Sequence, residues 1–279
     1  MYVKNGTGVL KQVLVSRPSF LKPAPINEIA KKWESTTLDV EKMEWEHQLF
    51  TDAYRSAGVD VVYLPSDIDR PNSVFARDFG GCIKEGYVLG KFKHSLREKE
   101  HTDYQKRMKE LGIPLIAKVE NGLFEGGDFA FLDESTIAIG MADRTNETGV
   151  EEIRTGLEPY GYRILGVPLK PEYLHLDMCF NLVDNHLAIA YEDGLPKEFK
   201  QELFRLGIKI ITVSEDAIFA HGCNLQALGN RRVLSLRQNN SLNLALKQQG
   251  MTVIELAITE ILKAGGGPHC MTFPLIRES

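Results

Sequence analysis

The sequence has no long apolar run. None of its stretches approaches the roughly eighteen consecutive apolar residues that a membrane-spanning helix requires. The opening segment, MYVKNGTGVLKQVLVSRP, also lacks the apolar stretch and the small-residue cleavage site of a secretory signal peptide. We therefore expect no membrane partner and a cytoplasmic location.

Closely spaced cysteines and an excess of basic residues are absent as well. The four cysteines stand at positions 82, 179, 223 and 270, so none forms a CxxC clip, and free thiols in a reducing compartment are expected. The formal net charge is −5, and lysine and arginine are scattered, which argues against a nucleic-acid-binding surface. The 43% hydrophobic content is ample for a packed core, which makes disorder an unsuitable interpretation.

What the sequence does contain is a repeat. Five times a helix-like segment ends at a glycine and a strand-like apolar segment follows, as in KELGIPLIAKV. A glycine at that place is typical of a helix C-cap, because glycine readily adopts the left-handed backbone conformation. The glycines of the five joints are Gly58, Gly112, Gly161, Gly207 and Gly250. Their spacings of 54, 49, 46 and 43 residues indicate a periodic unit.

A short turn with polar residues follows each of these strands, and a second strand comes after most of the turns. When the five turns are aligned, these residues fall at equivalent positions: Asp78, Glu125 with Asp128, His175 with Asp177, Asn224, and Cys270. Five like units predict a closed ring in which equivalent turns face one axis, so these side chains would share a pocket. Since no linker interrupts the repeat, residues 1–279 are expected to form a single domain.

Cys270, His175 and Glu125 together supply the groups of nucleophilic catalysis. A thiol is a strong nucleophile once ionised, and a carboxylate can orient a histidine that serves as general acid and base. Asp78 and Asp177 are additional, and two such carboxylates repel each other unless a cation lies between them. A guanidinium, with five donors in a fixed fork, matches two planar carboxylates best. The pattern predicts a guanidinium substrate that a thiol attacks at carbon.

The segments NSVFARD, FEGGD, ADRTNETG, HLDMCF and GGGPHCM resemble the motifs of the guanidine-modifying enzymes. That superfamily includes arginine deiminases, dimethylarginine dimethylaminohydrolases and amidinotransferases. The resemblance implies the pentein fold, an α/β propeller of five ββαβ units around a pseudo-fivefold axis. It also implies a covalent thiouronium intermediate on the cysteine, formed without a metal or another cofactor.

The resemblance assigns a role to each motif residue. Cys270 would be the nucleophile, His175 the general acid and base, and Glu125 the support of the histidine. Asp78 and Asp177 would hold the guanidinium. Four further positions would contact the substrate, mainly at its amino-acid end: Asn72, Arg144, Arg97 and Asp128.

Several alternatives stay open at this point. Arg97 lies in the charged segment SLREKEHTDYQKRMKE and equally fits a solvated helix face. A metal site would lack a ligand pair with standard zinc spacing. A non-catalytic pentein would not need the cysteine, histidine and glutamate together, and a cysteine amidase would have no use for two extra acids. Residues 21–45 are a candidate lid by position, and the oligomeric state, a homo-oligomer included, is undetermined.

Length and motifs favour different members of the superfamily. The chain has the size of the dimethylarginine hydrolases and lacks the extra helical domain of the longer arginine deiminases, whereas Asn72 and Asp177 are deiminase-like. A methylated nitrogen would leave a buried carboxylate partly unpaired, at a cost of about 1–3 kcal/mol. We therefore predict a hydrolase of a free arginine-like amino acid that releases citrulline with ammonia or an alkylamine. A dimethylarginine dimethylaminohydrolase and an amidinotransferase are the alternatives.

Overall fold

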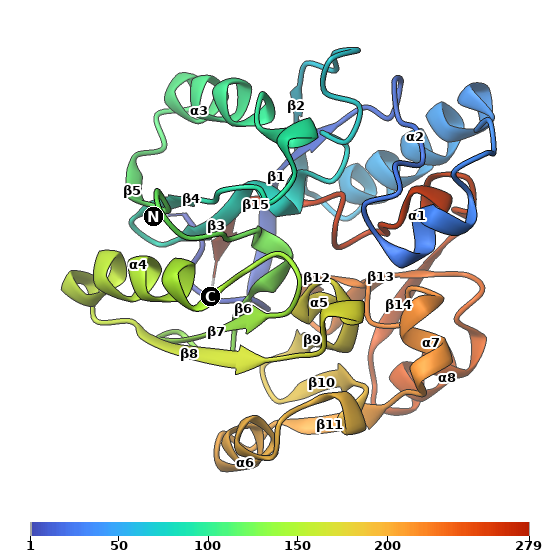
Figure 1. The fold of residues 1–279 in the computed structure, drawn as a ribbon. Coiled ribbons are helices and arrows are strands. Elements are labelled where there is room, and N and C mark those ends of the chain that lie inside the picture. Colours follow the sequence, from blue (N-terminus) through green and yellow to red (C-terminus); the bar gives the residue numbers. More distant parts are fainter. Residues whose placement is uncertain (1, 279) are drawn as a thin grey trace.

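Five small sheets surround a common axis in the computed structural model, which describes residues 2–278 (Figure 1). In every sheet the middle strand pairs antiparallel with one neighbour and parallel with the other. The strands, in spatial order, are β15 (Phe273–Glu278), β1 (Val9–Ser16) and β2 (Asp60–Leu64); β3 (Gly80–Ile83), β4 (Gly86–Leu89) and β5 (Leu115–Lys118); β6 (Phe129–Phe131), β7 (Thr136–Met141) and β8 (Arg163–Pro168); β9 (Phe180–Asp184), β10 (Leu187–Ala190) and β11 (Lys209–Thr212); β12 (Gln226–Gly229), β13 (Arg232–Leu236) and β14 (Thr252–Leu256).

A helix joins the middle strand of each sheet to its parallel outer strand, which gives five ββαβ units. These connecting helices are α2 (Val40–Ser56), α3 (Glu100–Glu110), α4 (Glu147–Leu157), α6 (Lys197–Arg205) and α8 (Asn240–Gln248). A shorter helix, α1 (Glu28–Lys32), precedes α2 in the same connection, and two more lie in the connections between sheets: α5 (Leu176–Cys179) and α7 (Glu215–Phe219). The predicted α/β propeller of five ββαβ units is confirmed.

The two ends of the chain complete one of the units. β15 pairs antiparallel with β1, with Val13 opposite Pro274 and Leu14 opposite Phe273. β1 then pairs in parallel with β2. Because the last strand joins the sheet of the first, the ring of units closes and the turn before β15 is fixed against the axis.

The predicted glycine joints end the connecting segments as expected. Each of the five glycines has a left-handed backbone, with φ between 69° and 80°. Side chains of L-residues rarely adopt this conformation, so glycine is required where the helix must end and turn back toward the sheet.

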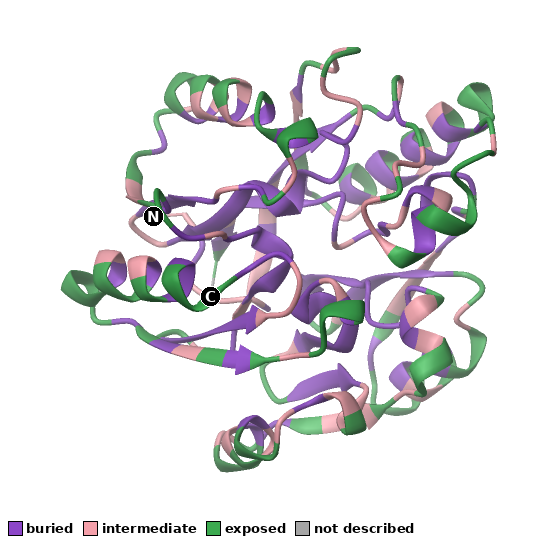
Figure 2. Cartoon of the chain, viewed as in Figure 1, coloured by how far each residue is buried: buried purple, intermediate pink, exposed green. Residues whose placement is uncertain are grey.

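The strands nearest the axis are buried and the outer strands are not. β3 and β12 are buried along their whole length, whereas β5 and β11 expose their first and last residues. Figure 2 shows the same gradient, with buried strands inside and helices that expose their outer faces. Within residues 2–278, none of the helices has the length and apolar character needed to cross a membrane.

Helix α2 is fastened to the segment that precedes Cys270. The Glu46 carboxylate is almost fully buried and accepts the backbone N–H groups of Thr259 and Glu260, each at 2.8 Å. It also accepts the Ile261 N–H at 3.4 Å. A buried carboxylate with several donors is a firm attachment, so α2 fixes the start of the glycine-rich turn.

Candidate active site

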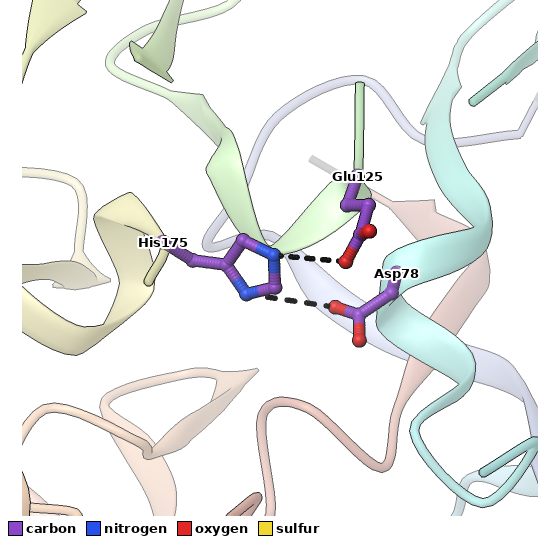
Figure 3. Close-up of side chains that lie close together, drawn as sticks. All are labelled: Asp78, Glu125 and His175. Atoms are coloured by element: carbon purple, nitrogen blue, oxygen red, sulfur yellow. Dashed lines mark hydrogen bonds and ion pairs between the residues drawn. The ribbon is translucent and has the colours of Figure 1, made fainter. Parts of the chain in front are cut away.

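The turns that enter the sheets meet at one end of the axis, as their sequence equivalence predicts. Asp78 lies in a 3-10 turn before β3, and Glu125 caps the 3-10 turn before β6. His175 is the N-cap residue of α5, and Cys270 lies in the turn before β15. Figure 3 shows the carboxylates of Asp78 and Glu125 directed at the imidazole of His175.

His175 lies between two carboxylates. Its Nε2 is 3.2 Å from Glu125 Oε2, and its Nδ1 is 3.8 Å from Asp78 Oδ1, which is too long for a hydrogen bond. Burial lowers the pKa of His175, but the neighbouring carboxylates, Asp78 foremost, outweigh burial and raise the pKa to about 9. The imidazole is therefore protonated at neutral pH and able to donate a proton.

Glu125 is an ionised carboxylate. Burial opposes its ionisation, but the hydrogen bond with His175 and the charge of Arg144 outweigh burial and lower the pKa of Glu125 to about 2. The glycine two residues later has a steric purpose, because a Cβ on Gly127 would lie 2.5 Å from His175 Nδ1. The FEGGD motif thus supplies both the partner of the histidine and the space for its ring.

The glycine run lets Cys270 approach the axis closely. A Cβ on Gly266 would lie 2.4 Å from a ring carbon of Phe75, so only glycine fits there. Asn224 orients the Cys270 thiol, since its Nδ2 is 2.9 Å from the Cys270 Sγ and its Oδ1 accepts the Cys270 N–H at 3.3 Å. Burial, then the charge of Asp177, raises the pKa of the Cys270 thiol well above its usual value, so the thiol is neutral at pH 7.

Two aspartates flank this thiol with one oxygen each in use. Asp177 Oδ2 is 3.6 Å from the Cys270 Sγ and 2.8 Å from His269 Nδ1, and Asp78 Oδ2 accepts Arg97 Nη1 at 2.5 Å. The other oxygens, Asp78 Oδ1 and Asp177 Oδ1, are buried without a hydrogen-bond partner among residues 2–278. Buried acceptors are nearly always paired, so the site is two N–H donors short.

The two aspartates are held differently. Burial raises the pKa of Asp78, and the charges of His175 and Arg97 only partly offset this effect. Burial also opposes ionisation of Asp177, but the hydrogen bond from His269 and the positive charges nearby together outweigh burial and lower the pKa of Asp177. Asp177 is therefore the carboxylate whose negative charge the protein itself secures.

Arg97 does not belong to a solvated helix face. Its side chain is 2% exposed and pairs with Asp78 and, at 2.9 Å, with Glu100. It also donates to the carbonyl of Phe75 at 3.1 Å and stacks its guanidinium over Phe92 at 4.3 Å. The surface interpretation was wrong, because Arg97 and Glu100 turn inward although the residues around them in the sequence are as charged as those of a surface helix. With its donors committed, Arg97 holds Asp78 in place.

The remaining predicted contact residues lie at different depths. Asn72 and Arg144 line a cavity of about 30 Å³ together with Asp78, His175 and Cys270. Arg144 donates to Glu125 at 3.1 Å, to Asp143 at 3.0 Å and to the Ile26 carbonyl. The Nδ2 of Asn72 is buried without a partner among the described residues.

Asp128 lies behind the cavity wall and does not line it. Its Oδ2 accepts the Thr145 hydroxyl at 2.7 Å, and its Oδ1 accepts the Leu176 N–H at 2.8 Å. It therefore holds the start of α5, next to His175, and the structure gives no support to its direct contact with substrate. The predicted lid region does cover the cavity, since Ala24, Ile26 and Asn27 form part of its wall.

Asn224 contacts the Cys270 thiol and His269 contacts the Asp177 carboxylate. The sequence assigned no chemical role to either residue. The alignment of the five turns already placed Asn224 at the position equivalent to the other polar residues, so the alignment could have identified it. His269 carried no such signal, because its partner Asp177 is distant in sequence.

Asp78, Glu125 and His175 could also form a metal site. Each offers one ligand atom, and the three atoms lie within 4.8 Å of one another. His175 would have to lose its proton to bind a metal, which the two neighbouring carboxylates oppose. A cationic substrate would be attracted by the same carboxylates and would not require His175 to lose its proton.

Comparison with known proteins identifies the family. Residues 19–277 match the model of the family described as N,N dimethylarginine dimethylhydrolase, eukaryotic. The chain belongs to this family. A Bacillus subtilis member of the same group of relatives, the uncharacterized protein YkgA, is 30% identical over 271 residues, which are 97% of this chain and 93% of that protein.

This chain is also similar to arginine deiminases. The arginine deiminase of Limosilactobacillus reuteri is 26% identical over 253 residues, which cover 75% of this chain and 62% of that enzyme. Chain and relatives together belong to the guanidine-modifying enzymes, as the motifs indicated. This membership indicates hydrolysis of a guanidino carbon–nitrogen bond.

Solved structures at lower identity show the fold. The N-terminal domain of ArgZ, an arginine dihydrolase from cyanobacteria bound to product, superposes with a TM-score of 0.83 at 22% identity and covers 94% of this chain and 96% of that one. DDAH from Pseudomonas aeruginosa, complexed with citrulline, gives a TM-score of 0.81 at 22% identity, with 95% and 99% covered. The pentein fold expected from the sequence is confirmed.

Proposed function

We propose that residues 1–279 form one catalytic domain that hydrolyses the guanidino group of a free arginine-like amino acid through Cys270. The observation that carries this proposal is the pair of buried, unpartnered oxygens, Asp78 Oδ1 and Asp177 Oδ1, on carboxylates beside the thiol. A guanidinium offers N–H donors in a plane and a positive charge. It would satisfy both oxygens and bring its central carbon to Cys270.

The substrate itself would activate the nucleophile. The thiol is neutral in the free enzyme, and His175, already protonated, does not serve as its base. A guanidinium that enters between the two aspartates favours the thiolate, because a nearby cation lowers the pKa of a thiol. The thiol proton leaves to solvent, and the sulfur electron pair forms a bond to the guanidinium carbon.

His175 would then serve both halves of the reaction. It donates its proton to the departing nitrogen as the carbon–nitrogen bond breaks, which leaves an S-alkylthiouronium on Cys270. The neutral imidazole next takes a proton from water, whose oxygen bonds to the same carbon. The carbon–sulfur bond breaks, the sulfur regains its electron pair, and the hydroxyl proton of the intermediate leaves to solvent, which releases a urea such as citrulline. No cofactor enters this scheme, and Glu125 keeps the imidazole oriented throughout.

Arg144 is the residue best placed to bind the substrate carboxylate. It lines the cavity and already donates to the neutral carbonyl of Ile26 in the covering segment. A carboxylate is a stronger acceptor for a guanidinium than a carbonyl. The incoming carboxylate would replace Ile26 at Arg144, and the segment around Ile26 must move because about 30 Å³ does not hold an amino acid. Asn72 offers its free amide to the same end of the substrate.

Dimethylarginine is the second candidate substrate. Family membership favours it, since the family model describes dimethylarginine hydrolases. Asp177 favours unmethylated nitrogens, because its Oδ1 needs an N–H donor that a dimethylated nitrogen lacks. We give the site chemistry more weight and propose arginine, with release of ammonia.

Mass spectrometry of products from one substrate mixture tests the proposal. The mixture contains arginine, monomethylarginine, dimethylarginine and agmatine, with and without glycine as an amine acceptor. Citrulline and ammonia from arginine are expected. Citrulline from dimethylarginine alone would replace the proposed substrate, and glycine-dependent guanidinoacetate would indicate an amidinotransferase. The absence of any product would contradict the catalytic proposal and favour a binding protein.

A further inference from the structure

A second cavity lies on the axis, on the opposite side of the Cys270 turn. All five units contribute to its wall, together with the N-terminal residues Val3, Asn5 and Gly6. Its volume is about 50 Å³, and we call it the axial cavity. We call the cavity lined by Asp78, His175 and Cys270 the substrate cavity, and no described residue lines both cavities. Asp177 is the one residue of the axial cavity's wall that also has a part in the proposed reaction.

Two buried arginines give the axial cavity its charge. Arg77 is 8% exposed and Arg277 is 3% exposed. Arg277 donates only to the carbonyls of Gly8 at 2.5 Å and Ala227 at 2.7 Å. Arg77 donates to the amide oxygen of Gln226 at 3.1 Å. Within residues 2–278, none of these hydrogen bonds goes to a carboxylate, although buried arginines are ordinarily paired with one.

One donor in this wall has no partner at all. The Nε–H of Arg77 is buried and makes no hydrogen bond within the described part of the chain. Burial lowers the pKa of Arg77, and burial together with the charge of Arg77 lowers the pKa of Arg277 to about 9. The positive charge of Arg77 therefore acts on Arg277 within this wall.

The carboxylate that faces the cavity does not balance both charges. Asp177 is the one acidic residue in the wall, and its Oδ2 is committed to His269. His269 itself is neutral at pH 7, since burial and the charge of Arg77 lower its pKa to about 4. Two cations against one anion leave a net positive charge in a buried, polar space. Such a charge is costly unless a counter-ion accompanies it.

We propose that the axial cavity binds one small monoanion of the size of chloride, held by the unpartnered Arg77 Nε–H and the charge of Arg277. The volume agrees with this ligand, because one water needs about 10–15 Å³ and the cavity therefore holds only a few particles of that size. Asp177 Oδ1 repels an anion, so the ion belongs on the arginine side. The backbone N–H of Arg77 donates to the Cys270 carbonyl at 2.9 Å, so the site adjoins the nucleophile turn.

Thermal unfolding in different salts tests the site. The wild-type protein is dialysed into sodium gluconate and titrated with sodium chloride or bromide at constant ionic strength. Gluconate, a sugar-acid anion, is too large for the cavity. A ligand of the folded state raises Tm with the logarithm of its concentration above its Kd, by about 3–6 °C at roughly ten times its Kd. If Tm in chloride and in bromide equals Tm in gluconate at the same ionic strength, the proposal is overturned.

A near-isosteric variant supplies the charge from within. Gln226→Glu keeps the oxygen that Arg77 contacts and adds a negative charge beside it, so the halide response of Tm should disappear. The matched control is Gln201→Glu on the exposed face of α6, which adds the same charge and should retain the full response. A Gln226→Glu protein with an undiminished halide response would contradict the site.

Diffraction from wild-type crystals grown in bromide gives an answer that does not depend on the variant's folding. An anomalous peak between Arg77 and Arg277, together with the halide-specific rise of Tm, supports the site. A peak without that response means an adventitious ion only and overturns the proposal. Density for water alone in bromide-grown crystals does so as well.

Discussion

The two cavities on the axis differ in charge although the same turns build both. The substrate cavity contains Asp78 and Cys270, whereas the axial cavity contains their chain neighbours Arg77 and His269. Arg77 and Asp78 are successive residues of the 3-10 turn before β3, and His269 and Cys270 are successive residues of the turn before β15. In both turns the two neighbouring side chains line different cavities. The comparison shows how a repeat builds two sites of opposite sign from adjacent residues.

The difference also explains what each site needs. The substrate side has an unpartnered oxygen on Asp78 and a neutral thiol, and Asp177, between the two cavities, has a second unpartnered oxygen, so a cation would complete it. The axial side has an unpartnered arginine N–H, and an anion would complete it. Substitutions of residues that would contact the substrate or the thiol should therefore alter catalysis. Substitutions of residues that hold those side chains in place should alter stability.

The largest effect is expected from Cys270→Ser, which removes the nucleophile of the substrate side. Turnover should fall by roughly 10³-fold or more, because a hydroxyl in this apolar, acidic setting is a poor nucleophile. Steady-state assays of citrulline formation measure it. Cys223→Ser, at a buried thiol away from the cavity, serves as control and should keep turnover. A Cys270→Ser enzyme with wild-type activity would remove Cys270 from the mechanism.

Glu125→Gln should reduce kcat/KM by up to about 10²–10⁴-fold, the range of positioned acid–base catalysis. It should also move the alkaline limb of the pH profile. His175 must be protonated to act, so activity falls as pH rises through its pKa of about 9. Without the Glu125 charge that pKa decreases, and the fall begins at lower pH.

The pH profile of kcat/KM separates this effect from a general loss of structure. The exposed variant Glu120→Gln on the same loop should keep both the rate and the limb. A Glu125→Gln enzyme that is slow but has an unmoved alkaline limb would show that Glu125 does not set the charge of His175.

Arg97→Ala should cost about 3–5 kcal/mol in the free energy of unfolding, because it leaves two buried carboxylates without their cation. Urea denaturation measures this loss. Lys106→Ala on the exposed side of α3 should stay within about 0.5 kcal/mol. If the two variants were equally mild, Arg97 would not be the support of Asp78 that the structure indicates.

Asp177→Asn should give the smallest effect and the most selective one. It removes a charged acceptor, a contribution of about 1.5–3 kcal/mol, so kcat/KM for arginine should fall roughly 10- to 100-fold. Dimethylarginine, with fewer N–H donors, should lose less. Kinetics with both substrates measure the ratio, and Asp184→Asn at the far end of β9 is the control. Equal losses for both substrates would refute the selectivity argument.

The sequence predicted the fold because the pattern that encodes it is local. Each glycine joint, such as Gly112, marks a helix end by a conformation that other residues avoid. The equivalence of the turns then placed Cys270, His175 and Glu125 together without knowledge of any distance. Local pattern and repetition suffice for these conclusions.

Long-range pairing was beyond the sequence. Nothing in SLREKE shows that Arg97 and Glu100 turn inward to meet Asp78, because their charges are those of a surface helix. The link from His269 to Asp177 crosses 92 positions and depends on ring closure. Arg77 and Arg277 likewise line one cavity only because β15 joins the sheet of β1.

Detection of the covalent intermediate tests the central claim most directly. Wild-type enzyme is mixed with arginine labelled at the guanidino carbon, quenched with acid during turnover, digested, and analysed by mass spectrometry. The account predicts the labelled carbon on the peptide that contains Cys270, and no adduct in Cys270→Ser. Labelled citrulline formed without any adduct on Cys270, or an adduct on another residue, would contradict it.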